Sequence, residues 1–295
     1  MSRKTPIVLI TGSLGSGKTT LVRQILQGTP HRLAVLMNEF GEVAIDSKII
    51  QGANIDIIEL AGGCVCCSMT GELEAAVREI IENIRPDFIL VEATGVAESD
   101  ALVYEVEDNL PEVRLEGVVC IVDAYLSIRH PSVGYTARTQ IASSDIILIN
   151  KVDLVAEEEV GIVEEQVRKY NDRAALARTI GCSVDHELLF GVTSTSRPRS
   201  PRSSGGTDFQ SFTWSTGKLL DSEKFEDLVT NLPEQVFRAK GFVRVQNGSV
   251  LFNYVAGRVD FEEFSSEETE LVFIGPDLNL VREGIRARLK ECEVE

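Results

Sequence analysis

The stretch GSLGSGKTT at residues 12–20 decides the fold, because it matches the pattern G-x-x-x-x-G-K-[ST] and follows an apolar segment at residues 6–11. A strand, a glycine-rich loop and a helix in this order form a P-loop. Such a loop curls its backbone N–H groups around a phosphate, while Lys18 adds a charge at the outer phosphates and Thr19 offers a hydroxyl to Mg²⁺. The stretch predicts a nucleoside triphosphate site made by Gly12, Ser13, Gly15, Ser16, Gly17, Lys18, Thr19 and Thr20.

Composition and charge narrow the functional classes. The 295 residues are enough for about two domains, and 43% of them are apolar. A net charge of -17 argues against nucleic acid or an anionic membrane as the main partner, since both favour basic patches. No apolar run is long enough for a membrane span, and the N-terminus leads into a strand rather than a cleavable signal. We therefore expect a cytoplasmic protein.

Short apolar strands alternate with helical stretches over the first two thirds of the chain. Besides the strand before the P-loop, we expect strands at residues 33–38, 55–60, 88–92, 117–123 and 146–150. Near-continuous apolar strands separated by helices indicate a mostly parallel sheet covered on both faces. The fold class is therefore α/β, with a P-loop NTPase domain over residues 1–194. Ligands of such sheets gather at the carboxyl ends of the strands.

A flexible linker and a smaller domain are expected beyond this point. Residues 195–207 read TSRPRSPRSSGGT, a composition that cannot bury enough surface to order itself. After it we expect a smaller α+β domain over residues 208–295, a size that can hold its own core. Its strands are predicted at 209–214, 241–246, 250–255 and 271–274, and its helices at 222–231 and 278–292.

The tetrapeptide Asn150-Lys151-Val152-Asp153 directly follows a predicted strand and suits guanine recognition. A fixed carboxylate at Asp153 can accept two hydrogen bonds from the N1–H and exocyclic amino group of guanine, and adenine offers no such pair. Leaving a desolvated carboxylate unpaired costs about 1–3 kcal/mol or more, enough to select GTP about tenfold. A loop that merely caps a helix would also fit these four residues, but the P-loop upstream favours a base-binding role for Asn150, Lys151 and Asp153.

The strand at 88–92 ends in Glu92-Ala-Thr-Gly95. This places a carboxylate where a P-loop protein holds Mg²⁺, directly or through water. Gly95 would let a backbone N–H approach the γ-phosphate. Lys18 and Glu92 are therefore the expected catalytic residues, and no side chain stands out as a base, since positioning and Mg²⁺ can account for slow hydrolysis.

The run GGCVCC at residues 62–67 lies between a predicted strand and a predicted helix. Thiolates at a helix start are favoured by its dipole, so Cys64, Cys66 and Cys67 should have a lowered pKa and bind borderline metals. Three thiolates from four residues do not close a four-ligand site. The remaining ligand would come from another loop, water or a partner, and Glu39 and Glu42 are the candidates from the chain.

Two other interpretations of the thiol cluster stay open. Closely spaced cysteines of lowered pKa can form a redox dithiol, and cysteines can also be inert core residues. Elsewhere, Cys120 in an apolar strand is expected to be core, and the remaining cysteines and all histidines stand singly: Cys182, Cys292, His31, His130 and His186.

Taken together, the motifs resemble those of the CobW-type family of metal-handling P-loop GTPases. The resemblance rests on GSLGSGKTT, NEFGEVAID, GGCVCC, VEATG and QIASSDIILINKVDL, and more loosely on KGFVRV and LVFIG near the end. It implies slow hydrolysis of GTP to GDP coupled to delivery of Zn²⁺ or Co²⁺ to a client metalloprotein. In that family pattern, the three cysteines take the metal, and Thr19 and Glu92 take Mg²⁺. The His-rich tract of many members is absent here, which argues against metal storage.

We expect residues 38–46 and 92–98 to act as switches, because both follow strands at the edge that faces the γ-phosphate. Two alternatives from other classes remain: a nucleotide-dependent scaffold that passes no metal, and a small-molecule kinase, against which the guanine motif argues. The client's identity and the formation of a homo-oligomer are left open by the sequence.

Overall fold

The computed structural model describes residues 4–29, 31–37, 55–59, 70–93, 95, 99–190 and 209–294. Contacts divide the chain into two compact units, an N-terminal unit of residues 2–186 and a C-terminal unit formed mainly by residues 187–295. The division therefore falls earlier in the chain than the limit of 194 expected from the sequence. The predicted linker at 195–207 lies outside the described residues.

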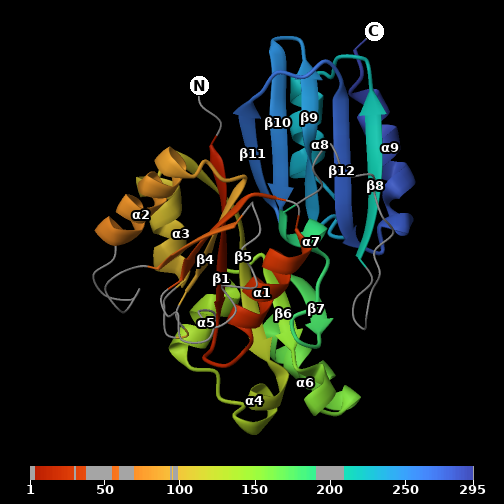
Figure 1. Ribbon diagram of the computed structural model, residues 1–295. Helices are drawn as coiled ribbons and strands as arrows, with labels where there is room; N and C mark the ends of the chain where they lie inside the picture. The colour runs from red at the N-terminus through yellow and green to blue at the C-terminus, as the bar shows by residue number, and fades with distance from the viewer. Residues whose placement is uncertain are drawn as a thin grey trace. The chain divides into compact units, whose positions relative to one another are not determined.

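Seven strands form the sheet of the N-terminal unit, in the order β3-β2-β4-β1-β5-β6-β7 (Figure 1). All of its ladders are parallel, which confirms the predicted α/β class. β7 was not foreseen from the sequence, because only alternate residues of this edge strand are buried. The strands are β1 (Thr5–Gly12), β2 (Leu33–Met37), β3 (Ile55–Glu59), β4 (Phe88–Glu92), β5 (Val113–Asp123), β6 (Ile146–Asn150) and β7 (Ala175–Thr179).

Helices cover both faces of this sheet. α2 (Thr70–Asn83) and α3 (Ser99–Asn109) share a core cluster with Val118, and α5 (Tyr135–Ala142) and α6 (Glu157–Arg168) share another with Cys120. Because Val118 and Cys120 are two residues apart on β5, these helices lie on one face. α1 (Lys18–Gly28) packs on the other face of β1 and β4 (Figure 1). α4 (Ala124–Arg129) and a 3-10 turn (Val152–Leu154) also belong to this unit, whereas α7 (His186–Phe190) is grouped from Glu187 on with the C-terminal unit.

The strand register gathers the predicted site at one edge of the sheet. Glu92 at the end of β4 pairs with Ile10 of β1, just before the P-loop. Asp123 at the end of β5 pairs with Asn150, which in turn pairs with Thr179 at the end of β7. The loops that follow these strands therefore emerge side by side, as expected at the carboxyl edge of a parallel sheet.

The C-terminal unit is built on a five-stranded antiparallel sheet in the order β11-β10-β9-β12-β8. Helices α8 and α9 pack through one apolar cluster against one face of this sheet (Figure 1), which confirms the predicted α+β architecture. The elements are β8 (Phe209–Thr216), α8 (Ser222–Thr230), β9 (Arg238–Val245), β10 (Gly248–Val255), β11 (Arg258–Glu263), β12 (Thr269–Pro276), a 3-10 turn (Leu278–Leu280) and α9 (Arg282–Glu291).

Two differences from the sequence-based expectation in the C-terminal unit have local reasons. The helix expected over 278–292 is a 3-10 turn followed by α9 from Arg282, since Asp277 has a left-handed φ of 52°. β11 was missed because its sequence RVDFEE is charged, as is typical of an edge strand.

None of the helices within the described ranges is long and apolar enough to cross a membrane.

Candidate nucleotide site

The P-loop joins β1 to α1 through glycines in backbone conformations that other residues rarely adopt. Gly12, Gly15 and Gly17 have φ values of 135°, 73° and 120°. A Cβ at Gly17 would lie 2.7 Å from both Asn150 Nδ2 and Cys182 Sγ, so this position also lacks space for a side chain. The loop backbone is therefore fixed from outside as well as by its own sequence.

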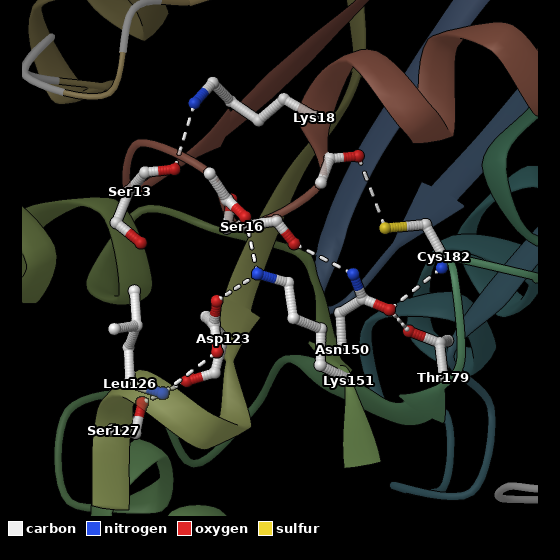
Figure 2. A network of polar contacts seen from close by, with 12 residues as sticks. Ser13, Ser16, Lys18, Asp123, Leu126, Ser127, Asn150, Lys151, Thr179 and Cys182 are labelled. Carbon is white, nitrogen blue, oxygen red and sulfur yellow. Dashed lines mark hydrogen bonds and ion pairs between the residues drawn. The ribbon is translucent and has the colours of Figure 1, made fainter. Parts of the chain in front are cut away.

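Lys18 begins α1 and is only 7% exposed. Its ammonium donates hydrogen bonds to the carbonyls of Gly12, at 3.0 Å, and Ser13, at 3.1 Å. Figure 2 shows the bond to Ser13. The charge is thus held at the loop itself. Thr20, two residues further along α1, is exposed.

Thr19 and Glu92 are brought together across the sheet edge. The Thr19 hydroxyl donates to Glu92 Oε1 at 2.9 Å. A hydroxyl and a carboxylate are oxygen donors of the kind that Mg²⁺ prefers, so the pair fits the predicted ion. Its binding there stays a prediction.

Gly95 packs its backbone against the P-loop, since a Cβ at this position would lie 2.6 Å from the Leu14 nitrogen. Its carbonyl accepts a hydrogen bond from Gln140 Nε2 at 3.4 Å. Of the predicted switches, residues 38–46, 94 and 96–98 lie outside the described residues.

Asn150 ties three loops together through one buried amide (Figure 2). Its Nδ2 donates to the Ser16 carbonyl at 2.8 Å. Its Oδ1 accepts from the Thr179 hydroxyl at 3.1 Å and from the Cys182 amide at 2.9 Å. Asn150 therefore links the P-loop to the turn that follows β7.

Lys151 crosses from the end of β6 back to the P-loop, starting from a left-handed backbone with φ 63°. Its ammonium donates to the Gly15 carbonyl at 2.8 Å and pairs with Asp123 Oδ2 at 2.5 Å. Asp123 also caps α4 by accepting from the Leu126 amide at 2.9 Å. Asp153 lies exposed on the 3-10 turn that follows. The start of this turn is held by the hydrogen bonds of Asn150 and Lys151.

Sequence reasoning missed Asp123, Thr179 and Cys182 in this network. The signal for Asp123 was available, because an Asp at the end of a strand and the start of a helix is a common N-cap. Cys182 gave no signal, since it has no spaced partner in the sequence. It is buried, and its thiol donates to the Gly17 carbonyl at 3.3 Å. Burial raises the pKa of this thiol to about 12.

The predicted metal ligands Cys64, Cys66, Cys67, Glu39 and Glu42 all lie outside the described residues. Within the ranges that the structure describes, no group of three or more His, Cys, Asp or Glu side chains is arranged to hold a metal ion. Cys120 is buried in the sheet, as expected, and burial raises the pKa of its thiol to about 12.

A glycine-rich loop between β1 and α1, a carboxylate at the end of β4 and an Asn-Lys-x-Asp turn after β6 define a P-loop NTPase fold. The profile of the family described as CobW/HypB/UreG, nucleotide-binding domain, matches residues 6–178. The profile of the cobalamin synthesis protein cobW C-terminal domain matches residues 209–293. The chain therefore belongs to the CobW/HypB/UreG family, which confirms the resemblance drawn from its motifs.

Named relatives agree with this membership. The chain is 33% identical to the zinc chaperone YjiA of Escherichia coli (strain K12) over 195 residues, which cover 63% of this chain and 61% of that protein. It is 26% identical to a zinc chaperone CobW of Sinorhizobium sp over 307 residues, or 87% of each protein. The crystal structure of Zn(II)-bound YjiA GTPase from E. coli covers 99% of this chain and 100% of that one, with a TM-score of 0.51 at 23% identity, and so shares the fold.

Proposed function

We propose that this chain is a GTP-hydrolysing metallochaperone, which binds Zn²⁺ or Co²⁺ on its Cys-x-Cys-Cys loop and passes the ion to a client metalloprotein. The observation that carries the proposal is the joining of the P-loop to the Asn-Lys-x-Asp turn through Asn150 and Lys151. The names of its relatives, several of them zinc chaperones, support the cargo.

Guanine selection is assigned to Asp153. Its backbone follows Asn150 and Lys151, whose side chains both donate to carbonyls of the P-loop, and these bonds support a base-binding role for the turn that carries the carboxylate. A carboxylate in that place would accept hydrogen bonds from the two N–H donors of guanine, whereas adenine would leave it without a partner.

Phosphate binding is assigned to the P-loop backbone and Lys18. When a nucleotide binds, the Lys18 ammonium would exchange its carbonyl acceptors on Gly12 and Ser13 for phosphate oxygens, a stronger charge-assisted interaction. Thr19 and Glu92 would hold Mg²⁺, which would neutralise the negative charge that develops on the phosphates during hydrolysis. We assign no base, because positioning and charge are sufficient for slow turnover to GDP.

The metal is assigned to Cys64, Cys66 and Cys67 by what the other cysteines do. The chain has six cysteines, and three of them, Cys120, Cys182 and Cys292, are buried in the described structure. Burial raises the pKa of each of these thiols, which disfavours the thiolate that a metal needs. Glu39 and Glu42 are proposed to complete the site, and a reducing cytoplasm would keep the thiols available.

Elemental analysis of the full chain, purified without chelators and loaded with GDP or a non-hydrolysable GTP analogue, tests cargo and nucleotide coupling together. We expect one Zn²⁺ or Co²⁺ per chain, with a Co²⁺–thiolate charge-transfer band that vanishes in the Cys66→Ser, Cys67→Ser variant. The matched control is Cys120→Ser, Cys292→Ser, which also removes two thiols and should keep the band.

Two results would overturn the metal assignment. One is undiminished metal affinity when all three cluster cysteines are serine. The other is a stable disulfide among them under reducing conditions, which would favour the redox interpretation. A client that gains no metal from the loaded protein, but still binds it, would favour the scaffold alternative.

A further inference from the structure

The segment that follows β7, residues 181–186, lies along α1 and touches it at three points; we call this segment the α1 strap. The Gly181 carbonyl accepts a hydrogen bond from Gln24 Nε2 at 2.6 Å. At the far end of α1, the His186 ring packs against Gly28, where a Cβ would lie 2.3 Å from His186 Cε1. The third contact, at the start of α1, belongs to Cys182.

Cys182 bonds to both halves of the nucleotide site. Its amide donates to Asn150 Oδ1 at 2.9 Å, on the side of the base-recognition turn. Its thiol donates to the Gly17 carbonyl at 3.3 Å, on the side of the P-loop (Figure 2). Cys182 itself has a left-handed φ of 59°, so the turn is shaped to point amide and thiol at these two acceptors.

The Gly17 carbonyl belongs to the same peptide unit as the Lys18 N–H. Since a trans peptide is planar, its C=O and N–H point in opposite directions. The Gly17 oxygen accepts two hydrogen bonds, one from the Leu21 amide at 2.9 Å, which begins the helical pattern of α1, and one from the Cys182 thiol. Together these donors hold the oxygen on the side of α1, so the Lys18 N–H points the opposite way, beyond the N-terminal end of the helix. Helical P-loop N–H groups of this kind are the ones that bind phosphate.

The thiol is suited to remain a donor. Burial raises its pKa to about 12, so it keeps its proton at neutral pH. Space is also limited, because Sγ lies 2.7 Å from where a Gly17 Cβ would be. A larger side chain at position 182 would push on the loop.

We propose that Cys182 is a positioning residue for phosphate binding, whose S–H group acts with the Leu21 amide on the Gly17 carbonyl and so holds the Gly17–Lys18 peptide plane with the Lys18 N–H facing the bound phosphate. The inference rests on the proposed guanine nucleotide site and adds a residue to it. It gives the chain a thiol that serves nucleotide binding and takes no part in metal binding.

The test compares Cys182→Ala, Cys182→Ser and the matched control Cys120→Ala, which removes a thiol equally buried in the same unit. We expect Cys182→Ala to weaken GDP and GTP binding about 3- to 10-fold, Cys182→Ser to recover most of this loss, and Cys120→Ala to stay within about twofold of the parent. In protein labelled with [15N]lysine, GDP should shift the Lys18 amide proton downfield in the parent and in Cys182→Ser, and less in Cys182→Ala.

The amide signal separates positioning from stability, because a merely structural role would lower the melting temperature without changing the Lys18 shift. If Cys182→Ala does not fold, the infrared S–H stretch of the parent, assigned by subtraction of Cys182→Ser, gives the same answer. We expect a band below the frequency of a thiol without a hydrogen bond, moving when GDP binds.

Equal nucleotide affinity and an equal Lys18 shift in Cys182→Ala would overturn the inference, as would an S–H band at the unbonded frequency that ignores GDP. Failure of the parent itself to bind GDP or GTP is a different result, since it would refute the proposed function.

Discussion

Each unit of this protein contains a pair of cations that donate to backbone carbonyls, and the two pairs serve different ends. In the N-terminal unit, Lys18 and Lys151 bond to carbonyls of the P-loop. In the C-terminal unit, Arg238 on β9 donates to the Leu189 carbonyl at 3.1 Å, and Lys240, two residues along, donates to the Phe190 carbonyl at 3.4 Å.

The acceptors distinguish the two pairs. The carbonyls of Leu189 and Phe190 end the short helix α7, where intrahelical partners run out and a positive charge is favoured by the helix dipole. Arg238 is fully buried and caps that end permanently. The P-loop carbonyls instead belong to a loop of the kind whose N–H groups bind phosphate. Burial and a carbonyl partner are therefore not enough to identify a ligand-binding cation. The kind of backbone that supplies the carbonyl, a helix C-terminus or a P-loop, is more informative.

The largest expected effect is that of Lys18→Ala. Removing the ammonium deletes charge-assisted bonds to the outer phosphates, worth about 2–3 kcal/mol, so GTP affinity should fall about 30- to 160-fold and hydrolysis should be lost. Titration with a fluorescent GTP analogue measures this. The melting temperature should change little. If the variant instead has a lower melting temperature and normal GTP affinity, Lys18 has a structural role like that of Arg238. The proposed difference between the two pairs would then be wrong.

Arg238→Met should show the opposite pattern. It leaves buried carbonyls of α7 unsatisfied, so urea unfolding should reveal a loss of about 1–3 kcal/mol, while GTP affinity stays within about twofold of the parent. Lys218→Met, which removes an exposed cation paired with Glu293 in the same unit, is the control and should cost less than about 1 kcal/mol. A fall in nucleotide affinity with unchanged stability would contradict the capping role.

A smaller effect is expected from Thr19→Ala. The substitution removes one of two oxygen donors for Mg²⁺ and one hydrogen bond to Glu92, so GTP affinity in the presence of Mg²⁺ should fall about 5-fold. Affinity measured with a chelator in place of Mg²⁺ should match that of the parent. An equal fall under both conditions would show that Thr19 acts on the loop rather than on the ion.

Most of the site residues that the sequence predicted belong to short motifs of neighbouring residues, and Glu92 was predicted from its place at the end of a buried strand. The P-loop glycines, Lys18 and the turn ending in Asp153 each work through local backbone shape, so spacing alone reveals them. Asp123 and Cys182 come from the ends of other strands and act by reaching across the sheet edge. Their contacts with Lys151, Asn150 and the P-loop depend on the order of the strands in the sheet, which a local sequence pattern does not predict.

The fold shows the same division between local and distant causes. The continuous apolar sequence of buried parallel strands such as β2 made them predictable, and the bounds of β2 were predicted within one residue. The start of β5 was missed by four residues. Residues 187–190 group with the C-terminal unit, in which Arg238 and Lys240, about fifty positions away, donate to the Leu189 and Phe190 carbonyls. The sequence near α7 does not indicate this grouping.

The central claim is that Asp153 reads guanine from a turn anchored to the P-loop. Competition binding of GTP, ATP and xanthosine triphosphate to the parent and to Asp153→Asn tests it most directly. The parent should prefer GTP over ATP about tenfold or more. Asp153→Asn should lose affinity for GTP and gain it for xanthosine triphosphate, whose base presents a carbonyl where guanine has an amino group. Equal binding of ATP and GTP by the parent, or an Asp153→Asn variant with unchanged preference, would contradict the account.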